Sequence, residues 1–493
     1  MSKITLKKIA ALSSQPQISI AILLGIPLLC IAGLSTIHPI LAIIISISGV
    51  TLSLFILKPV LPYYLLIILH HLGYFFFNFT IGHWEANFIT ISELYIVIIP
   101  LLWFFSRSIN LAAPYPGTVC DMPLLLFVGL SLLSLLWTND FFHGTVQMII
   151  LFFGLVVAFV VALSVINSHT RLNTVVWFII IIGVFDSIIC FFSIYSKYSY
   201  PDYIEIPLYD YKNFGLTLFF NFAGKRGHAF IHPLITAFFL NFALMLSFGK
   251  FITTKGNKKV AIGIIMFLML TAHLTTLGKG PLLALIMGIV FVFYFIRPIR
   301  KVFFISISLL IIIIIASFIV GNIVELENSL RFTTHQMTGY DESSSTSTRI
   351  SWWMISIEKS IESFGFGVGI GGIPKFLKPV APHAHNAFIG AFGELGFLGL
   401  GLLLFIYFLA FKSYFKAFME CKSEYYKRIL LTYIGGFITL VLTIFYSFNY
   451  TLDSAWWYIG LGFALIKLAK KAPAGFMGEK LPFFKDKESI CGI

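Results

Sequence analysis

Charged side chains are scarce in this 493-residue chain: they make up only 11% of it, whereas 58% of the residues are apolar. Soluble domains carry about 25% charged and about 45–50% apolar residues. So few charges leave too little polar surface to keep this much apolar surface dissolved in water. The composition therefore excludes a soluble domain and indicates an integral membrane protein.

Cysteine is scarce as well, with five residues and no C-x-x-C pair or other metal-ligand spacing. Cys30 and Cys190 fall within apolar runs, and the other three fall in segments that we expect on the inner side of the membrane. No cysteine is expected in an oxidising compartment, so no disulfide is implied. We expect neither a metal nor any other cofactor.

The net charge of +13 does not by itself indicate a nucleic-acid partner. No DNA- or RNA-binding module is visible in the sequence, and cytoplasmic loops of membrane proteins collect Lys and Arg. We expect no nucleic acid among the partners.

Apolar runs long enough to cross a hydrocarbon core of about 30 Å dominate the sequence. The fold class expected is an all-α polytopic membrane protein with about fourteen transmembrane helices (12–14). Unbroken runs such as ISISLLIIIIIASFIV exclude β-barrel strands, which alternate every second residue. The runs at 61–80 and 281–296 are the weakest. The runs lie near 18–35, 39–57, 61–80, 89–106, 122–137, 143–166, 173–196, 229–249, 260–277, 281–296, 302–320, 388–411, 429–447 and 454–469.

The distribution of cations predicts the orientation of these spans. If the N-terminus is cytoplasmic and all fourteen runs cross, 24 of the 34 Lys and Arg residues lie on the inner side. This asymmetry satisfies the positive-inside rule. Both termini are therefore expected in the cytoplasm.

Two outer connections are long, at about 197–228 and 321–387, and long ordered loops are usually functional. They divide the chain into four expected parts. N-terminal helices fill 1–320 and include the loop 197–228; a large outer loop follows at 321–387, C-terminal helices at 388–469 and a cytoplasmic tail at 470–493.

The most informative segment is FGFGVGIGGIPKFLKPVAPHAHNAFIGAFGELGFLGLG, in which a glycine-rich turn leads to His383 and His385 and then into an apolar helix. Nine residues separate Asn386 from Gly396, and two more separate Gly396 from Gly399. This H-N-x9-G-x-x-G pattern resembles the signature of the bacterial O-antigen ligase and polymerase superfamily.

Two upstream stretches extend the resemblance. STSTRISWWMISIEKSIESFGFGVGIGG is similar to the Arg…Trp…Gly-x-Gly stretch that precedes the histidine in that family, and KRGHAFIHPLITAFFL to its other Arg-bearing outer loop. The resemblance is specific over about 345–400 and weaker at 224–240. In TTLGKGPLLAL the chain departs from the family, because Lys279 stands where many relatives have Arg.

The resemblance implies a metal-independent, C-class glycosyltransferase in the bacterial inner membrane. Its donor would be a glycan on undecaprenyl diphosphate, its active site periplasmic, and its acceptor a lipid A core (ligase) or another lipid-linked glycan (polymerase). The implied partners also include membrane lipids and a chain-length regulator protein.

Residue chemistry is compatible with this reaction. A diphosphate leaving group needs cations, and the planar fork of Arg matches phosphate oxygens. A neutral His is the usual base for an acceptor hydroxyl. We expect His385 to be the general base of an inverting transfer. The candidates for donor binding are Arg226, Arg349, Lys225 and Lys279, and the expected supporting residues are Asn386, Glu394 and His383.

Simpler interpretations stay open for these residues. An interfacial His beside an Asn is often a helix cap, and Arg at an interface often binds lipid headgroups. The pair Trp352-Trp353 fits an aromatic belt better than a sugar platform. At the level of the whole protein, the alternatives are a flippase for lipid-linked oligosaccharides or a structural scaffold. No single residue distinguishes a ligase from a polymerase. Of the two, we slightly prefer the polymerase.

Overall fold

The computed structural model describes residues 61–72, 75–81, 84–108, 114–196, 203–211, 214–221, 233–296, 345–377, 383–447, 449–451 and 453–476. The expected spans near 18–35, 39–57 and 302–320 lie outside these ranges, as do the basic N-terminus and the last part of the tail.

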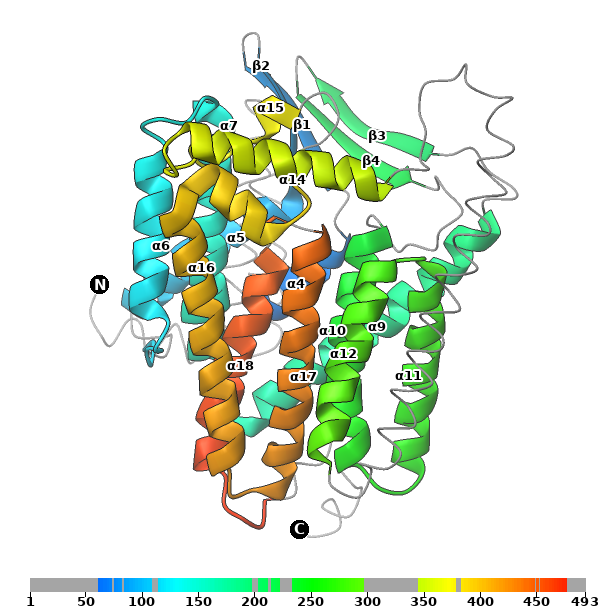
Figure 1. The fold of residues 1–493 in the computed structure, drawn as a ribbon. Coiled ribbons are helices and arrows are strands. Elements are labelled where there is room, and N and C mark those ends of the chain that lie inside the picture. The colour runs from blue at the N-terminus through cyan, green and yellow to red at the C-terminus, as the bar shows by residue number, and fades with distance from the viewer. Residues whose placement is uncertain are drawn as a thin grey trace, which may run out of the picture.

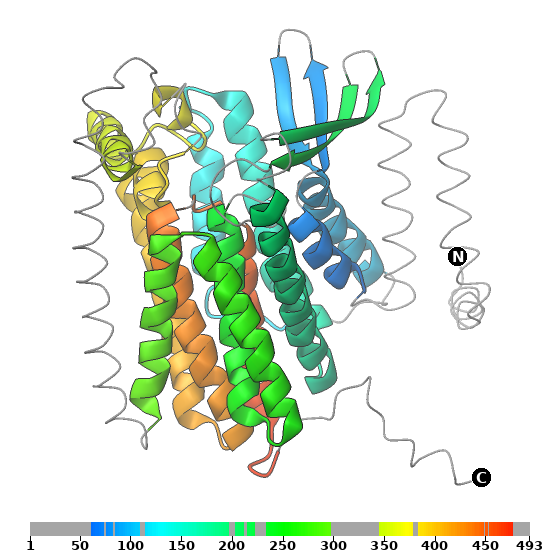
Figure 2. The same cartoon turned by 90° about the vertical axis from the view of Figure 1, so that its right-hand side faces the viewer.

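The helices run up and down in a bundle, and a small sheet lies at one end of it (Figures 1 and 2). A π-helical stretch, η1 (Val156–Val161), and a short helix, α8 (Ala162–Val165), continue α7. The main helices are α4 (Leu61–Leu72), α5 (Ile91–Ser108), α6 (Asp121–Ser134), α7 (Phe141–Leu155), α9 (His169–Ser196), α10 (Pro233–Thr253), α11 (Asn257–Thr275), α12 (Lys279–Phe295), α16 (Ala387–Glu420), α17 (Glu424–Ser447) and α18 (Asp453–Lys471).

Within the described residues, six helical stretches are long and apolar enough to cross a membrane. They make the chain a polytopic membrane protein, while the total of about fourteen spans stays a prediction. The six are Phe141–Val165, His169–Ser193, Pro233–Thr253, Asn257–Thr275, Ala387–Glu420 and Glu424–Tyr446; shorter apolar helices lie at Tyr95–Phe105, Asp121–Ser134 and Lys279–Phe295.

The described residues are mostly helical, as expected, but they also contain strands that the sequence did not predict. Two hairpins form one antiparallel sheet with the strand order β2-β1-β4-β3, from β1 (Phe75–Ile81), β2 (Trp84–Thr90), β3 (Tyr203–Tyr211) and β4 (Phe214–Asn221). These strands are rich in Phe, Tyr, Ile and Thr, which favour extended backbone. A search for apolar runs does not separate such segments from helices, because it scores apolarity and not period.

The sheet also overturns the expected span at 61–80. Helix α4 ends at Leu72, and β1 begins at Phe75. The twelve residues of α4 rise only about 18 Å at 1.5 Å each. This length is less than the thickness of the hydrocarbon core of a bilayer.

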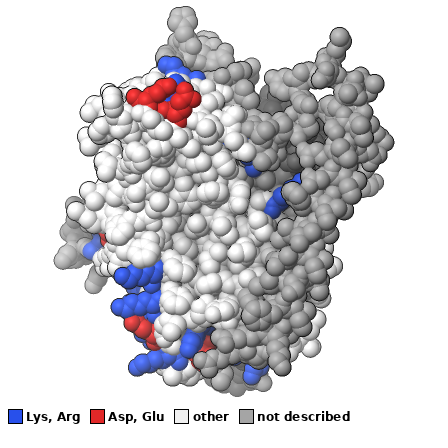
Figure 3. Space-filling model, in the orientation of Figure 1, with Lys and Arg blue, Asp and Glu red and all other residues white. Residues whose placement is uncertain are grey.

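The described part of the long loop 321–387 contains α14 (Ser345–Glu362) and the single turn α15 (Pro374–Leu377). Figure 1 shows α14 lying across the end of the bundle, on the same side as the sheet and the start of α16. Many Lys and Arg side chains gather at the opposite end, where α16 ends and α17 begins (Figure 3).

Glycines allow α12 and α17 to pack closely in the middle of the bundle. A methyl group at Gly288 of α12 would lie 2.5 Å from the carbonyl oxygen of Gly435 in α17 and would also overlap Thr439. Small residues at such contacts let membrane helices approach. Next to this contact, Tyr433 of α17 stacks on Tyr458 of α18, with 4.4 Å between the ring centroids.

Gly288→Ala should therefore lower the free energy of unfolding by about 1–3 kcal/mol, the usual cost of overpacking a filled core. Gly401→Ala on α16 is the matched control, because no heavy atom lies within 4 Å of the added methyl group. Thermal melting of the purified proteins in detergent measures both. Equal melting temperatures would contradict the close α12–α17 contact.

Candidate active site

Helix α16 is kinked at Gly396, where the backbone has a φ of 67° and a ψ of −161°. The amide of the next residue, Phe397, donates to the carbonyl oxygen of Gly365, 2.9 Å away. A Cβ atom at Gly396 would overlap this same oxygen. Both the positive φ and the close approach require glycine at position 396.

The glycine-rich loop after α14 is fixed against the first turns of α16. The amides of Val368 and Gly369 donate to the carbonyl oxygens of Gly393 and Glu394, each over 2.9 Å. On its other side the loop contacts the end of α6, since the Ile370 amide donates to Ser134 Oγ over 3.0 Å. The loop is thus held between α16 and α6.

Glu394 is 3% exposed and ties this loop to a third segment of the chain. Its carboxylate accepts a hydrogen bond of 2.6 Å from the hydroxyl of Tyr450, between α17 and α18. It also accepts from the backbone amides of Gly371 and Ile373. Burial, together with the adjacent carboxylate, raises the pKa of Tyr450, so its hydroxyl keeps the proton that it donates.

Asn386 is the N-cap of α16. Its side-chain oxygen accepts from the amides of Phe388 and Ile389, each over 3.0 Å, and the residue is fully buried. Such a cap satisfies amides that have no partner within the helix. The structure therefore gives Asn386 a definite local role: it fixes where α16 begins and so the position of the residue before it.

That residue, His385, has a left-handed backbone with a φ of 54°. Its amide donates to Nδ1 of His383 over 3.0 Å, and the two rings lie 4.1 Å apart. One face of the His385 ring stacks on Trp352 of α14, with centroids 5.1 Å apart and an interplanar angle of 24°. Both histidines are half-buried, and among the described residues no three His, Cys, Asp or Glu form a group able to hold a metal ion.

Arg349 lies in the second turn of α14 and is half-buried. Its Nη1 donates to the carbonyl oxygen of Tyr446 over 3.0 Å, near the end of α17. A cation at a helix C-terminus is favourable, because the terminal carbonyl groups carry partial negative charge. A guanidinium has five N–H donors, so it can make more than one such contact at the same time.

Lys279, the first residue of α12, is exposed and belongs to the same neighbourhood. The next residue, Gly280, is so close to Tyr446 that an added Cβ would lie 3.2 Å from the Cβ of that tyrosine. Trp353, next to the tryptophan that stacks on His385, packs on Phe445, with ring centroids 6.1 Å apart. The end of α17 therefore brings the segments of Lys279, Arg349 and His385 together.

The other two predicted donor-binding residues, Lys225 and Arg226, lie outside the described residues. Of the described candidates, His383 adjoins His385, and Asn386 and Glu394 support the same corner of the fold. The carboxylate of Glu394 bonds to Tyr450 and the glycine-rich loop.

Two contributors were missed in the sequence. Tyr450 carries no sign of its role, because its partner Glu394 is 56 residues away in the chain. Trp352 was assigned to an aromatic belt, but the structure stacks it on His385. No local pattern predicts either contact, since both depend on how the loops fold back on α16.

Comparison with known proteins adds one finding. Residues 264–404 match the family model described as O-antigen ligase. The match runs from α11 through α12 and α14 to the middle of α16, and so contains Lys279, Arg349 and the His385 region. No curated protein matches the chain.

If Glu394 holds this corner together, Glu394→Ala should destabilise the protein strongly. It would leave two amides and the Tyr450 hydroxyl without their acceptor, and each buried unsatisfied group costs about 1–3 kcal/mol. We expect a loss of at least about 2 kcal/mol in the free energy of unfolding. The control is Glu362→Gln, because that carboxylate is 53% exposed and its ion pair with Lys359 should contribute little. A wild-type melting temperature for Glu394→Ala would contradict the assigned role.

Proposed function

We propose that this protein, which belongs to the O-antigen ligase and polymerase superfamily through residues 264–404, is a membrane glycosyltransferase that uses a lipid-linked glycan. The observation that carries the proposal is the meeting of three segments at the end of α17. One supplies the half-buried His385, and the other two supply the cations Arg349 and Lys279.

The cations suit the donor, a glycan on undecaprenyl diphosphate. As the bond between the sugar and the diphosphate breaks, negative charge grows on the leaving group. Arg349 and Lys279, with Lys225 and Arg226 from the other outer loop, would bind the phosphate oxygens and stabilise that charge. Stabilisation that increases toward the transition state accelerates the reaction.

His385 suits the acceptor side of the reaction. In the proposed step, the imidazole takes the proton of an acceptor hydroxyl, whose oxygen attacks the anomeric carbon. The bond from that carbon to the diphosphate oxygen breaks, and the configuration inverts. Because Trp352 covers one face of the ring and the amide of His385 is bonded to His383, the base is oriented before substrates arrive.

The arrangement of charge supports a definite orientation. The cation-rich end of the bundle lies away from α14 (Figure 3), and the positive-inside rule assigns such an end to the cytoplasm. We therefore propose a periplasmic active site in the bacterial inner membrane, with both termini cytoplasmic. The division into 1–320, 321–387, 388–469 and 470–493 is part of the same proposal.

Ligase and polymerase share this mechanism and differ in the acceptor, which is a lipid A core or another lipid-linked glycan. The glycan pattern of a deletion strain separates them. Single repeat units on the lipid A core would identify a polymerase, which would then be tested for a chain-length regulator as partner. Long chains left on the carrier would identify a ligase.

His385→Ala should lower the rate of transfer by about 10²–10⁴-fold, the usual contribution of a general base. Binding of the donor should change little, because the cations are untouched. His383→Ala is the matched control on the same loop and should have a milder effect. Rates are measured with purified protein and lipid-linked donor. A correctly inserted and active His385→Ala protein would overturn the assignment of the base.

Arg349→Ala should weaken both donor binding and turnover by about tenfold or more, since a charge-assisted contact contributes about 1.5–3 kcal/mol. Arg349→Lys should lose donor binding and turnover as well, because an ammonium group cannot make the two parallel hydrogen bonds of a guanidinium. The same losses are expected for Arg226→Ala. Lys359→Gln on α14 is the control, because that side chain pairs with the exposed Glu362. Near-normal turnover in both Arg→Ala proteins would make these residues lipid anchors.

A further inference from the structure

Helix α14 carries an exposed apolar stripe. Ile350, Met354 and Ile361 are spaced four and seven residues apart, so they share one side of the helix. Their exposed fractions are 49%, 62% and 62%. Exposed apolar side chains that line up in this way indicate an interaction surface, whereas single exposed residues do not.

The other sides of α14 have different surroundings. Trp352 stacks on His385, and Ser360 donates to the carbonyl oxygen of Phe392 over 2.8 Å, so one side packs on the protein. Glu362 is turned by about 100° from Ile361 and forms an exposed ion pair with Lys359. Figure 3 shows acidic side chains at the end of the molecule where α14 lies. A helix that lies flat, with separate apolar and charged sides, is typical of a membrane interface.

The apolar surface continues from α14 onto α16. Phe364, which is 92% exposed, and the exposed Phe366 flank Gly365. The carbonyl oxygen of Gly365 accepts from the amide of Phe397, and a Cβ atom at Gly365 would overlap the Phe397 ring. Phe397 and Leu398 are exposed in turn. Because α16 is long and apolar enough to cross the membrane, lipid covers these side chains, and the same lipid reaches Phe364 and Phe366.

A tryptophan at the end of α6 lies beside the same loop. Trp137 is exposed, and its Nε1 donates to the carbonyl oxygen of Gly367 over 3.2 Å. Tryptophan is enriched where a membrane meets water, because its ring is apolar while its N–H group needs a partner. Leu136, next to it, is also exposed. A second helix therefore presents side chains suited to the interface at this level.

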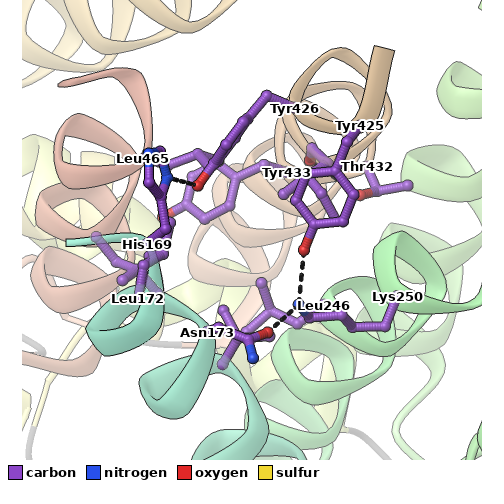
Figure 4. A pocket seen from close by; sticks show the side chains of 13 residues that line it. His169, Leu172, Asn173, Leu246, Lys250, Tyr425, Tyr426, Thr432, Tyr433 and Leu465 are labelled. Carbon is purple, nitrogen blue, oxygen red and sulfur yellow. Dashed lines mark hydrogen bonds between the residues drawn. The ribbon is translucent and has the colours of Figure 1, made fainter. Parts of the chain in front are cut away.

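The opposite end of the bundle has a polar character, which indicates the leaflet that α14 would contact. There, Lys250 donates to Oδ1 of Asn173 and, over 2.9 Å, to the hydroxyl of Tyr425 (Figure 4). Many Lys and Arg side chains gather on the surface at that end (Figure 3). The positive-inside rule assigns it to the cytoplasm. In this orientation α14 lies at the periplasmic leaflet.

We propose that α14 and the turn after it form a lipid-binding surface. Its apolar side inserts into the periplasmic leaflet, at the boundary between headgroups and acyl chains, and its partner is the bilayer lipid itself. Because α14 also carries Arg349 and Trp352, this contact sets the depth at which both residues lie in the membrane. The surface does not depend on the reaction proposed above. It consists of Ile350, Met354, Ile361, Phe364 and Phe366.

The test measures how strongly lipids brominated in their acyl chains quench the fluorophore NBD. The purified full-length protein carries NBD on the single substitution Ile361→Cys and is reconstituted into lipid nanodiscs. Glu362→Cys is the matched control, because it lies at the same position along the helix but on the charged side. Cys120 and Cys190 are kept because they are buried, and Ala replaces the remaining native cysteines, Cys30, Cys421 and Cys491.

We expect brominated lipid to quench Ile361→Cys at least twofold more strongly than Glu362→Cys, and aqueous iodide to quench them in the reverse order. Equal quenching of the two by brominated lipid would overturn the proposal. So would stronger quenching of Ile361→Cys by iodide, because the stripe would then face water. Protection of Ile361→Cys from both quenchers would also overturn it, since protein would then cover the stripe. If Ile361→Cys does not fold, Met354→Cys decides by the same criteria.

Discussion

The contact between the backbones of Gly365 and Gly396 is the constraint on which the candidate active site depends. It kinks α16, because the amide after Gly396 must reach the carbonyl oxygen of Gly365. With the backbones this close, the glycine-rich loop lies against the first turns of α16 and Glu394 can reach the loop amides. The loop in turn anchors α14, which carries Trp352 and Arg349. This backbone contact thus holds the glycine-rich loop, and with it α14, against the helix that follows His385.

This contact gives a physical meaning to the spacing H-N-x9-G-x-x-G. Asn386 caps the helix, and the nine residues that follow it lead to the kink at Gly396. The spacing could therefore be recognised in the sequence as a family signature. Its structural reason could not be predicted, because the partner of Gly396 is Gly365, which lies in a loop whose path no periodicity predicts. For the same reason the Glu394–Tyr450 bond was invisible before the structure was known.

Apolar runs predicted the helices better than the sheet. The six described spans coincide with predicted runs, since long stretches of Leu, Ile and Val leave few alternatives in a membrane. Strand β1 replaced part of an expected span, because an aromatic segment of seven residues is apolar enough to be taken for part of a helix. Strands β3 and β4 lie in the segment 197–228, which was expected to be a loop. Length decides between a span and a shorter segment: a helix of twelve residues, such as α4, is too short to cross a bilayer unaided.

Glu394 and His385 both have the chemistry of a base, and their surroundings differ. Glu394 is 3% exposed, and its oxygens accept from Tyr450 and two backbone amides. Taking a proton from a substrate would mean giving up bonds that hold the loop to α16. His385 is half-buried, one face of its ring stacks on Trp352, and its backbone amide donates to Nδ1 of His383. An acceptor hydroxyl needs a base that it can reach without unfolding the site. This requirement favours His385 for the chemistry and leaves to Glu394 the task of keeping that histidine's surroundings in place.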